Sequence, residues 1–253
     1  MYTPEERERL RSDLIAAARA DARLTGAAIT GSAAAGLEDE WSDIDLAFGV
    51  GDASALRDVL EAWTSRMYER HEALHHVDVP SGAWIYRVFL LRNTLQVDLA
   101  FAPAEDFGAR APTFRLLFGA AAERPYAPSP APAELVGLAW LYALHARSSI
   151  ARGRLWQAEF MVSAVRDHVL ALASVRHRLP AAYARGADRL PAAVTEPLAG
   201  ALVRRLDVEE LRRAFGVALE ALRAEVRHVD PELARRIDAV LVELTATPAR
   251  PIA

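Results

Sequence analysis

The chain has 253 residues, of which 52% are hydrophobic and 25% charged, the balance of a folded globular protein, so wholesale disorder is excluded. The 30 basic residues, all arginine, against 34 acidic ones leave a formal charge of −4, which provides no overall attraction to a nucleic acid. The sequence contains no cysteine, which excludes disulfides, thiolate metal sites and cysteine nucleophiles.

The first residues predict a helix from about residue 3 to residue 21. Thr3 is a capping residue, Pro4 suits the first helical position and Glu6 completes a capping box. This start does not resemble a signal peptide, which needs an apolar run behind a basic start. The longest apolar stretch, 136–144, is far shorter than the roughly 20 residues that span a bilayer. We therefore expect a cytoplasmic protein with no membrane partner.

The remainder of the first half mixes strand and helix patterns. An apolar segment, 27–30, ends at Gly31-Ser32 and is followed by a loop. Polar and apolar residues then alternate over 43–50, which predicts a strand, and the apolar spacing over 53–70 predicts a helix. Two runs rich in aromatic and branched residues, 84–91 and 94–101, predict a hairpin joined by Arg92-Asn93.

The second half reads almost wholly as helix. We place a domain boundary in the proline-rich stretch 125–132, so the expected domains are residues 1–125 and 126–253. Its first helix is apolar all round, which predicts burial at the centre of a bundle. The expected fold class is α+β, a mixed sheet with its helices followed by a helical bundle. The predicted helices of the bundle are 133–152, 154–179, 191–205, 208–228 and 231–246.

Asp43 and Asp45 are the residues most indicative of chemistry. Residues two apart in a strand point to the same face, so the two carboxylates project side by side while Ile44 enters the core. They repel each other unless they are well solvated or a cation lies between them, and magnesium is the simplest candidate. Asp98 is also flanked by apolar residues in a predicted strand, and three such acids could hold two ions about 3.5 to 4 Å apart.

Gly31 and Ser32 lie where the first strand should end. A glycine there lets backbone amides approach a phosphate, and the serine hydroxyl and amide can donate to its oxygens. Together with the three acids, this predicts a site for a metal-bound nucleoside triphosphate.

The order and spacing of these parts resemble the DNA polymerase beta-like nucleotidyltransferase superfamily. Gly31-Ser32 is followed after ten intervening residues by Asp43-Ile44-Asp45, and then by the apolar-flanked Asp98. With a helical domain behind it, the chain looks most like the small-molecule branch, the aminoglycoside and lincosamide nucleotidyltransferases. The motif match covers about residues 27–101. The chain departs from the pattern at Ala35, where many relatives carry arginine.

The resemblance implies an enzyme that transfers a nucleoside monophosphate, AMP from ATP in the first instance, to a hydroxyl of a small acceptor and releases pyrophosphate. Asp43, Asp45 and Asp98 would hold two Mg²⁺ ions. Related antibiotic-modifying enzymes place an acidic base in the helical domain, and Glu159, in the segment 154–159, is the matching residue; it would act across a cleft between the domains.

Further expectations follow from the same resemblance. Gly31 and Ser32 would hold the triphosphate, and Ser42 would contact the nucleotide or orient the aspartate strand. The acidic balance suits a cationic acceptor such as an aminoglycoside better than a nucleic acid, which implies a role in antibiotic resistance. Some relatives complete their sites across a dimer, so a homodimer is an open alternative to a monomer, which the sequence does not decide.

Other interpretations stay open at this point. Asp43 and Asp45 can be a solvated strand face, and Asp98 can cap or pair with an arginine such as Arg87 or Arg92. Glu159 can belong to a surface ladder with Ser163 and Arg166, four and seven residues further on. At the level of function, the rivals are an antitoxin-type nucleotidyltransferase that binds or modifies a partner protein, and a catalytically silent nucleotide-binding relative, which Ala35 makes conceivable.

Overall fold

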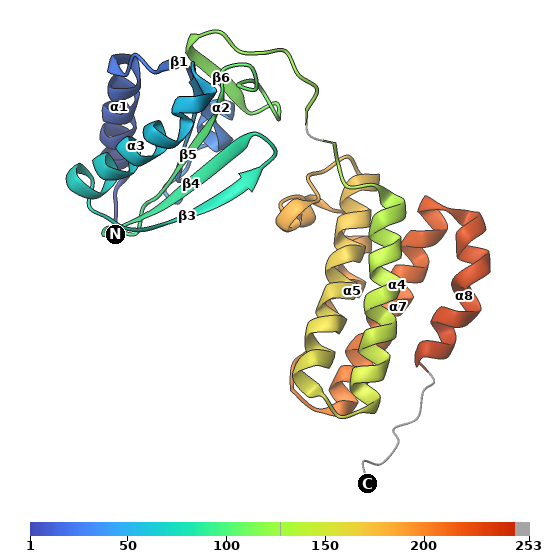
Figure 1. Cartoon of the computed structure of the whole chain (residues 1–253). Helices are drawn as coiled ribbons and strands as arrows, with labels where there is room; N and C mark the ends of the chain where they lie inside the picture. Colours follow the sequence, from blue (N-terminus) through green and yellow to red (C-terminus); the bar gives the residue numbers. More distant parts are fainter. Residues whose placement is uncertain (127, 246–253) are drawn as a thin grey trace. The chain divides into compact units, whose positions relative to one another are not determined.

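The computed structural model describes residues 1–126 and 128–245, and the chain forms two compact units (Figure 1), Met1–Ala127 and Pro128–Ala253. Each unit has its own hydrophobic core. The class is α+β, with the strands in the first unit and helices alone in the second. Within the described ranges, every helix is too short or too polar to cross a membrane.

The first unit is built on a mixed six-stranded sheet. Its strands lie in the order β3-β4-β5-β2-β1-β6, and β2 and β5 are parallel whereas the other neighbours are antiparallel. The elements in chain order are α1 (Pro4–Ala20), β1 (Leu24–Thr30), α2 (Gly31–Ala35), β2 (Ile44–Val50), a 3-10 turn (Ala53–Ala55), α3 (Leu56–Arg70), β3 (Ala73–Ser81), β4 (Trp84–Leu91), β5 (Gln96–Pro103) and β6 (Phe114–Gly119).

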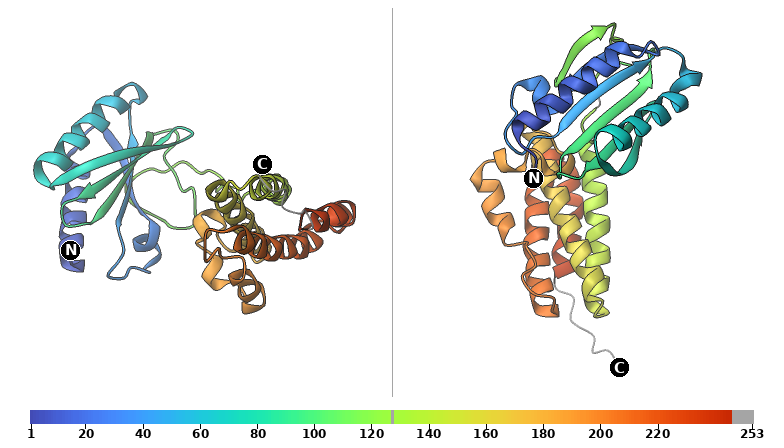
Figure 2. Two further views of the ribbon diagram at one scale, coloured as in Figure 1. Left: turned by 90° about the horizontal axis from the view of Figure 1, so that it is seen from below. Right: turned by 90° about the vertical axis from the view of Figure 1, so that its left-hand side faces the viewer.

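Helices α1 and α3 cover one face of this sheet, as the two views of Figure 2 show. The predicted capping box of α1 is present, because the Thr3 side chain accepts from the Glu6 amide while the Glu6 side chain accepts from the Thr3 amide. The core under the helices consists of large side chains, which include Phe48, Trp63 and Phe101. This face supplies most of the apolar burial of the unit, at about 25 cal/mol per Å².

The opposite face carries a smaller core of alanines and aromatic rings. Phe107, in the loop after β5, is fully buried there. A Cβ atom added at Gly26 or Gly49 would lie 2.6 or 2.8 Å from the Phe107 ring, so the two glycines on neighbouring strands form the slot that receives it. This contact fixes the loop between β5 and β6 to the sheet.

The first unit differs from the sequence prediction at three places. Strands β3 and β6 were not predicted. Gly31-Ser32 and the first residues of the predicted loop form the one-turn helix α2, which ends at Ala35 and is capped by Gly36 in a left-handed conformation. The connection of the predicted hairpin contains four residues, 92–95, and not two, because Thr94 adopts φ +71° and the second strand begins only at Gln96.

The second unit is a bundle of antiparallel helices (Figure 1). Its principal contacts join α4 to α5, α5 to α7 and α7 to α8. A bidentate ion pair between Arg176 and the buried Glu225 links α5 to α7, with N···O distances of 2.6 and 2.9 Å. The helices are α4 (Pro132–Ala151), α5 (Leu155–Arg176), α6 (Ala192–Ala199), α7 (Val208–Val229) and α8 (Pro231–Thr245), with 3-10 turns at Ala182–Ala184 and Ala187–Arg189.

Two predictions for this unit are wrong. Helix α4 was predicted to be buried at the centre of the bundle because it is apolar all round. It is buried on one face only, and Trp140 on its outer face is 41% exposed. Helix α6 ends at Ala199, six residues before the predicted end. Residue 246, the predicted end of the last helix, lies outside the described residues.

Candidate active site

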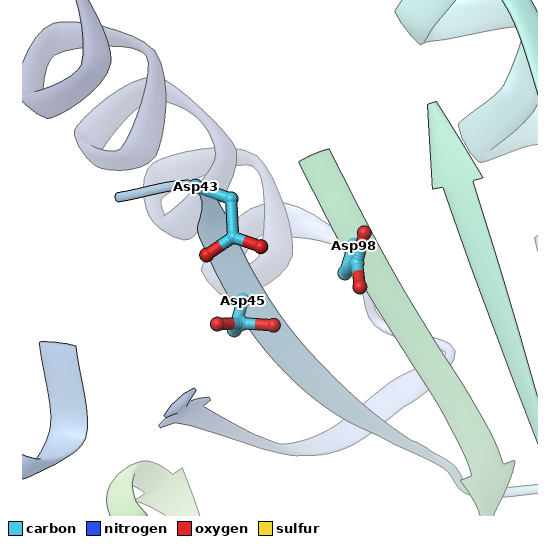
Figure 3. A group of neighbouring side chains, drawn as sticks. All are labelled: Asp43, Asp45 and Asp98. Carbon is cyan, nitrogen blue, oxygen red and sulfur yellow. The ribbon is translucent and has the colours of Figure 1, made fainter. Parts of the chain in front are cut away.

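Asp43, Asp45 and Asp98 gather on the sheet face that α1 and α3 leave uncovered. Strand alternation explains this position, because Ile44 and Leu46 are fully buried on the helix side while Asp45 points the other way. Parallel pairing of β2 and β5 sets Asp45 directly beside Asp98. One carboxylate oxygen from each of the three residues lies within 4.8 Å of the others, and all three residues are half-buried (Figure 3).

Gln96 joins this group and was not predicted as a site residue. Its side-chain amide donates to Asp98 Oδ1 at 3.0 Å and to Asp43 Oδ2 at 3.3 Å. Gln96 lies two residues before Asp98 in β5, so the period of the strand could have placed it on the same face. The amide holds two of the carboxylates at a fixed separation.

Gly31 packs its backbone against Asp45. It has φ +63°, and a Cβ atom added there would lie 1.9 Å from Asp45 Oδ2. A side chain at position 31 would therefore enter the space that the carboxylate occupies, and the left-handed backbone also favours glycine. Ser32 follows in the first turn of α2, so the structure places the Gly31-Ser32 segment at the edge of the acidic group.

The loop that leads into Asp43 is held by the start of the chain and by α1. The buried Arg7 donates from Nη1 to the carbonyl oxygens of Asp39 and Ser42, at 2.6 and 2.9 Å, and the Tyr2 hydroxyl donates to the same Ser42 carbonyl at 3.0 Å. Arg11 Nη1 donates to Glu38 at 2.5 Å. These contacts fix the backbone immediately before Asp43.

Ser42 itself stabilises the turn of this loop. Its hydroxyl accepts from the Asp39 amide at 2.9 Å and donates to Asp39 Oδ1 at 3.0 Å. The Ser42 hydroxyl, followed by the Trp41 amide, holds the pKa of Asp39 below its ordinary value. Ser42 thus stabilises the loop before Asp43, and its predicted roles in orienting the aspartate strand and in contacting the nucleotide stay predictions.

The three acids have the donor chemistry that a hard divalent cation requires. All the ligand atoms are carboxylate oxygens, which suit Mg²⁺, Ca²⁺ or Mn²⁺ and do not suit soft metals. A divalent cation would offset the mutual repulsion of three neighbouring carboxylates. The residues therefore fit the predicted metal.

A cavity of about 360 Å³ opens beside Asp43, at the end of the sheet where β5 begins. It is lined by Met1, Tyr2, Trp41, Asp43, Thr94 and Gln96. Trp41 is 68% exposed, so its indole face is available to a ligand in this cavity. None of the described side chains that line it is basic, and the Asp43 carboxylate and the aromatic faces of Tyr2 and Trp41 suit a hydroxylated or cationic molecule.

Glu159 belongs to the second unit, in the second turn of α5. Its carboxylate accepts from the Ser163 hydroxyl at 2.7 Å. Arg166 forms its ion pair with Asp167, at 2.7 Å. Of the surface ladder considered for Glu159, the contact with Ser163 is present. The role of Glu159 as a base stays a prediction.

The sequence matches no protein-family model and no curated protein. The fold is similar to the crystal structure of an aminoglycoside 6-adenyltransferase from Bacillus subtilis, with a TM-score of 0.43 and 14% identity, covering 98% of this chain and 100% of that chain.

Proposed function

We propose that this protein is a nucleotidyltransferase that moves a nucleoside monophosphate, AMP from ATP in the first instance, onto a hydroxyl group of a small molecule. The observation that carries the proposal is the convergence of Asp43, Asp45 and Asp98 from two parallel strands, next to the Gly31 backbone. Transfer of a phosphoryl group depends on positioning of the reactants and on neutralisation of the phosphate charge. Three acids that hold metal ions provide both.

The reaction balances as a single displacement. The acceptor oxygen forms a bond to the α-phosphorus, the bond from that phosphorus to the oxygen bridging it to the β-phosphate breaks, pyrophosphate leaves, and the hydroxyl proton passes to a base. Asp43, Asp45 and Asp98 would hold two Mg²⁺ ions. Bound there, the ions would supply neutralisation of the phosphate charge.

Each neighbouring residue has a role that its contacts suggest. Gln96 keeps the carboxylates of Asp43 and Asp98 at their separation, because its amide donates to both. The Gly31 and Ser32 amides and the Ser32 hydroxyl are donors available for phosphate oxygens beside the acids.

We assign proton removal to Glu159 of the second unit, on the ground of the family resemblance alone.

The acceptor class is inferred from the cavity beside Asp43. A carboxylate and the exposed Trp41 indole suit a small, hydroxylated and cationic molecule such as an aminoglycoside-like antibiotic, because an ammonium group is attracted by both. Modification of such an antibiotic would give resistance to it.

The test is a pyrophosphate-release assay with four nucleoside triphosphates, a panel of hydroxylated acceptors and Mg²⁺. We expect metal-dependent release that disappears in Asp43→Asn, because that variant removes one charged ligand. Asp13→Asn, an exposed carboxylate on α1, is the matched control and should keep full activity. Activity that persists in Asp43→Asn would refute the assignment, and ATP binding without turnover on any acceptor would favour a silent relative.

A second assay addresses the proton. Glu159→Gln should lower kcat by about 10²-fold or more, the usual contribution of a general base, with little change in ATP affinity. Ser163→Ala removes the hydrogen bond to Glu159 without removing the carboxylate and serves as the control. Unchanged turnover in Glu159→Gln would leave that residue with its structural partner only.

A further inference from the structure

A second pocket lies on the same sheet face, beyond the acids. It has a volume of about 120 Å³. Its floor includes Ala47 and Ala100, which follow Asp45 and Asp98 by two residues in the same strands. Two residues of strand span about 6.6 Å, so a molecule held among the carboxylates can extend directly into this pocket. The alanines leave the space that larger side chains would fill.

Aromatic rings and the loop after β5 form the walls. Trp84 and Tyr86 lie nearly parallel on one side, with ring centroids 6.0 Å apart and an interplanar angle of 25°, and Phe114 lies among the lining residues from the loop and β6. The loop is held by the buried Phe107, whose carbonyl accepts from the Ala122 amide at 2.7 Å. The walls are thus in place before any ligand arrives.

The charge of the pocket is that of a single cation. Arg110 is the one charged residue among the described residues that line it, and its Nη1 donates to the Ser81 carbonyl at 2.9 Å. Its guanidinium also lies beside the Tyr86 hydroxyl; burial raises the pKa of Tyr86 and Arg110 opposes that shift, so the phenol is neutral at pH 7. A guanidinium donates to carbonyl oxygens and ring nitrogens and repels ammonium groups.

We infer that this pocket binds one flat, uncharged, heteroatom-bearing ring of a substrate held at the carboxylates, stacked on the aromatic wall and facing Arg110 with a hydrogen-bond acceptor. The pocket, of about 120 Å³, is somewhat smaller than the cavity of about 150 Å³ that encloses benzene, so it can receive one ring whose edge extends out of the open side. The ring can come from two sources, the base of the nucleotide or a ring of the acceptor. The inference rests on the proposed function, which supplies the substrate held at the carboxylates and these two sources of its ring. It also separates this pocket from the cavity beside Asp43, which suits a cation.

The test is direct binding, measured by saturation-transfer NMR with the full chain. The probes are adenosine and benzamide, a carbonyl-bearing ring without ribose or phosphate. We expect both to bind, and we expect Arg110→Gln to weaken binding about tenfold or more, the usual loss for a hydrogen bond from a charged donor. Ala111→Trp, at the exposed rim of the pocket, should block both probes. Arg115→Gln, an exposed arginine of β6, is the matched control.

Competition then assigns the source of the ring. Displacement of benzamide by ATP with Mg²⁺ assigns the pocket to the nucleotide base, and simultaneous binding assigns it to the acceptor. Failure of both probes to bind, or equal binding by the wild type, Arg110→Gln and Ala111→Trp, overturns the inference. Because probe binding should survive in Asp43→Asn, loss of the proposed activity and loss of this pocket's role are distinguishable.

Discussion

The two faces of the sheet in the first unit are made by alternate residues of the same strands, yet they differ in kind. On the face covered by α1 and α3, Leu46 and Phe48 are fully buried among other large apolar side chains. On the opposite face, Asp45 and Ala47 lead from an acidic group into a small pocket. One face supplies folding free energy, and the other leaves charged groups and space where a ligand can bind.

The difference teaches how an unfavourable group of charges can be maintained. Three neighbouring carboxylates destabilise a fold in the absence of a cation, and the strands tolerate them because their other face is well packed. On the covered face, charged side chains meet partners of opposite charge. Arg87, for example, binds Asp78 in β3 and the Thr64 hydroxyl in α3, at 2.6 Å each.

The largest expected effect is the contrast between substitutions at two adjacent residues, one on each face of the sheet. Asp45→Asn should abolish Mg²⁺-dependent pyrophosphate release while changing the free energy of unfolding little. Leu46→Ala should lower that free energy by about 2 to 5 kcal/mol, the usual loss for a buried leucine, and keep activity at temperatures where the variant is folded. Urea unfolding and the release assay, run on both variants, measure the contrast. An Asp45→Asn variant that retains activity, or that unfolds as easily as Leu46→Ala, would break it.

Gly31→Ala should have the next largest effect, because it perturbs the open face through the backbone. The new Cβ would displace the Asp45 carboxylate, so we expect weaker Mg²⁺ binding and a fall in activity of tenfold or more. The left-handed φ adds a cost of about 1 kcal/mol in stability. Gly36→Ala is the control, because Gly36 has a similar φ of +67° but open space around its Cα. Metal titration by calorimetry should change only in the first variant.

The smallest expected effect is a change in stability at low pH, caused by an ion pair on the covered face. The Arg87 guanidinium, which hydrogen-bonds Asp78, holds the pKa of that carboxyl below its ordinary value of 3.8. A lowered pKa in the folded state adds stability that is present above about pH 4 and lost as the pH falls below it. Asp78→Asn should therefore reduce stability at pH 7 and flatten its decline in acid. Thermal unfolding midpoints from pH 2.5 to 7 test this, with Glu69→Gln on the exposed side of α3 as the control; an unchanged acid slope in Asp78→Asn would contradict it.

The elements that bury one face were predictable from sequence, and the exposed elements were not. The alternation over 43–50 indicated β2 and the orientation of its two acids, and the capping residues marked the start of α1. Strand β3 escaped because it is an edge strand, exposed along most of its length and containing Pro80, so no alternation marks it. The exposed Trp140 shows the converse, since apolar composition does not say which face of a helix meets the core.

For the candidate site, residue types were predictable and pairing was not. The sequence indicated that Asp43 and Asp45 share a face, but the register of Asp45 with Asp98 depends on a parallel pairing across α3, β3 and β4, which local patterns do not encode. The positions of Tyr2 and Arg7 under the loop before Asp43 also depend on tertiary packing, and no sequence signal marks them.

The seating of Phe107 between Gly26 and Gly49 has a further consequence for how this protein can change. The residues beyond Gly108, which packs closely against Ala122, follow an anchored ring, so changes in this part of the loop are separated from the strands that bear the acids. Under the proposals above, substitutions in this short surface loop can change which substrates bind while the three acids keep their arrangement.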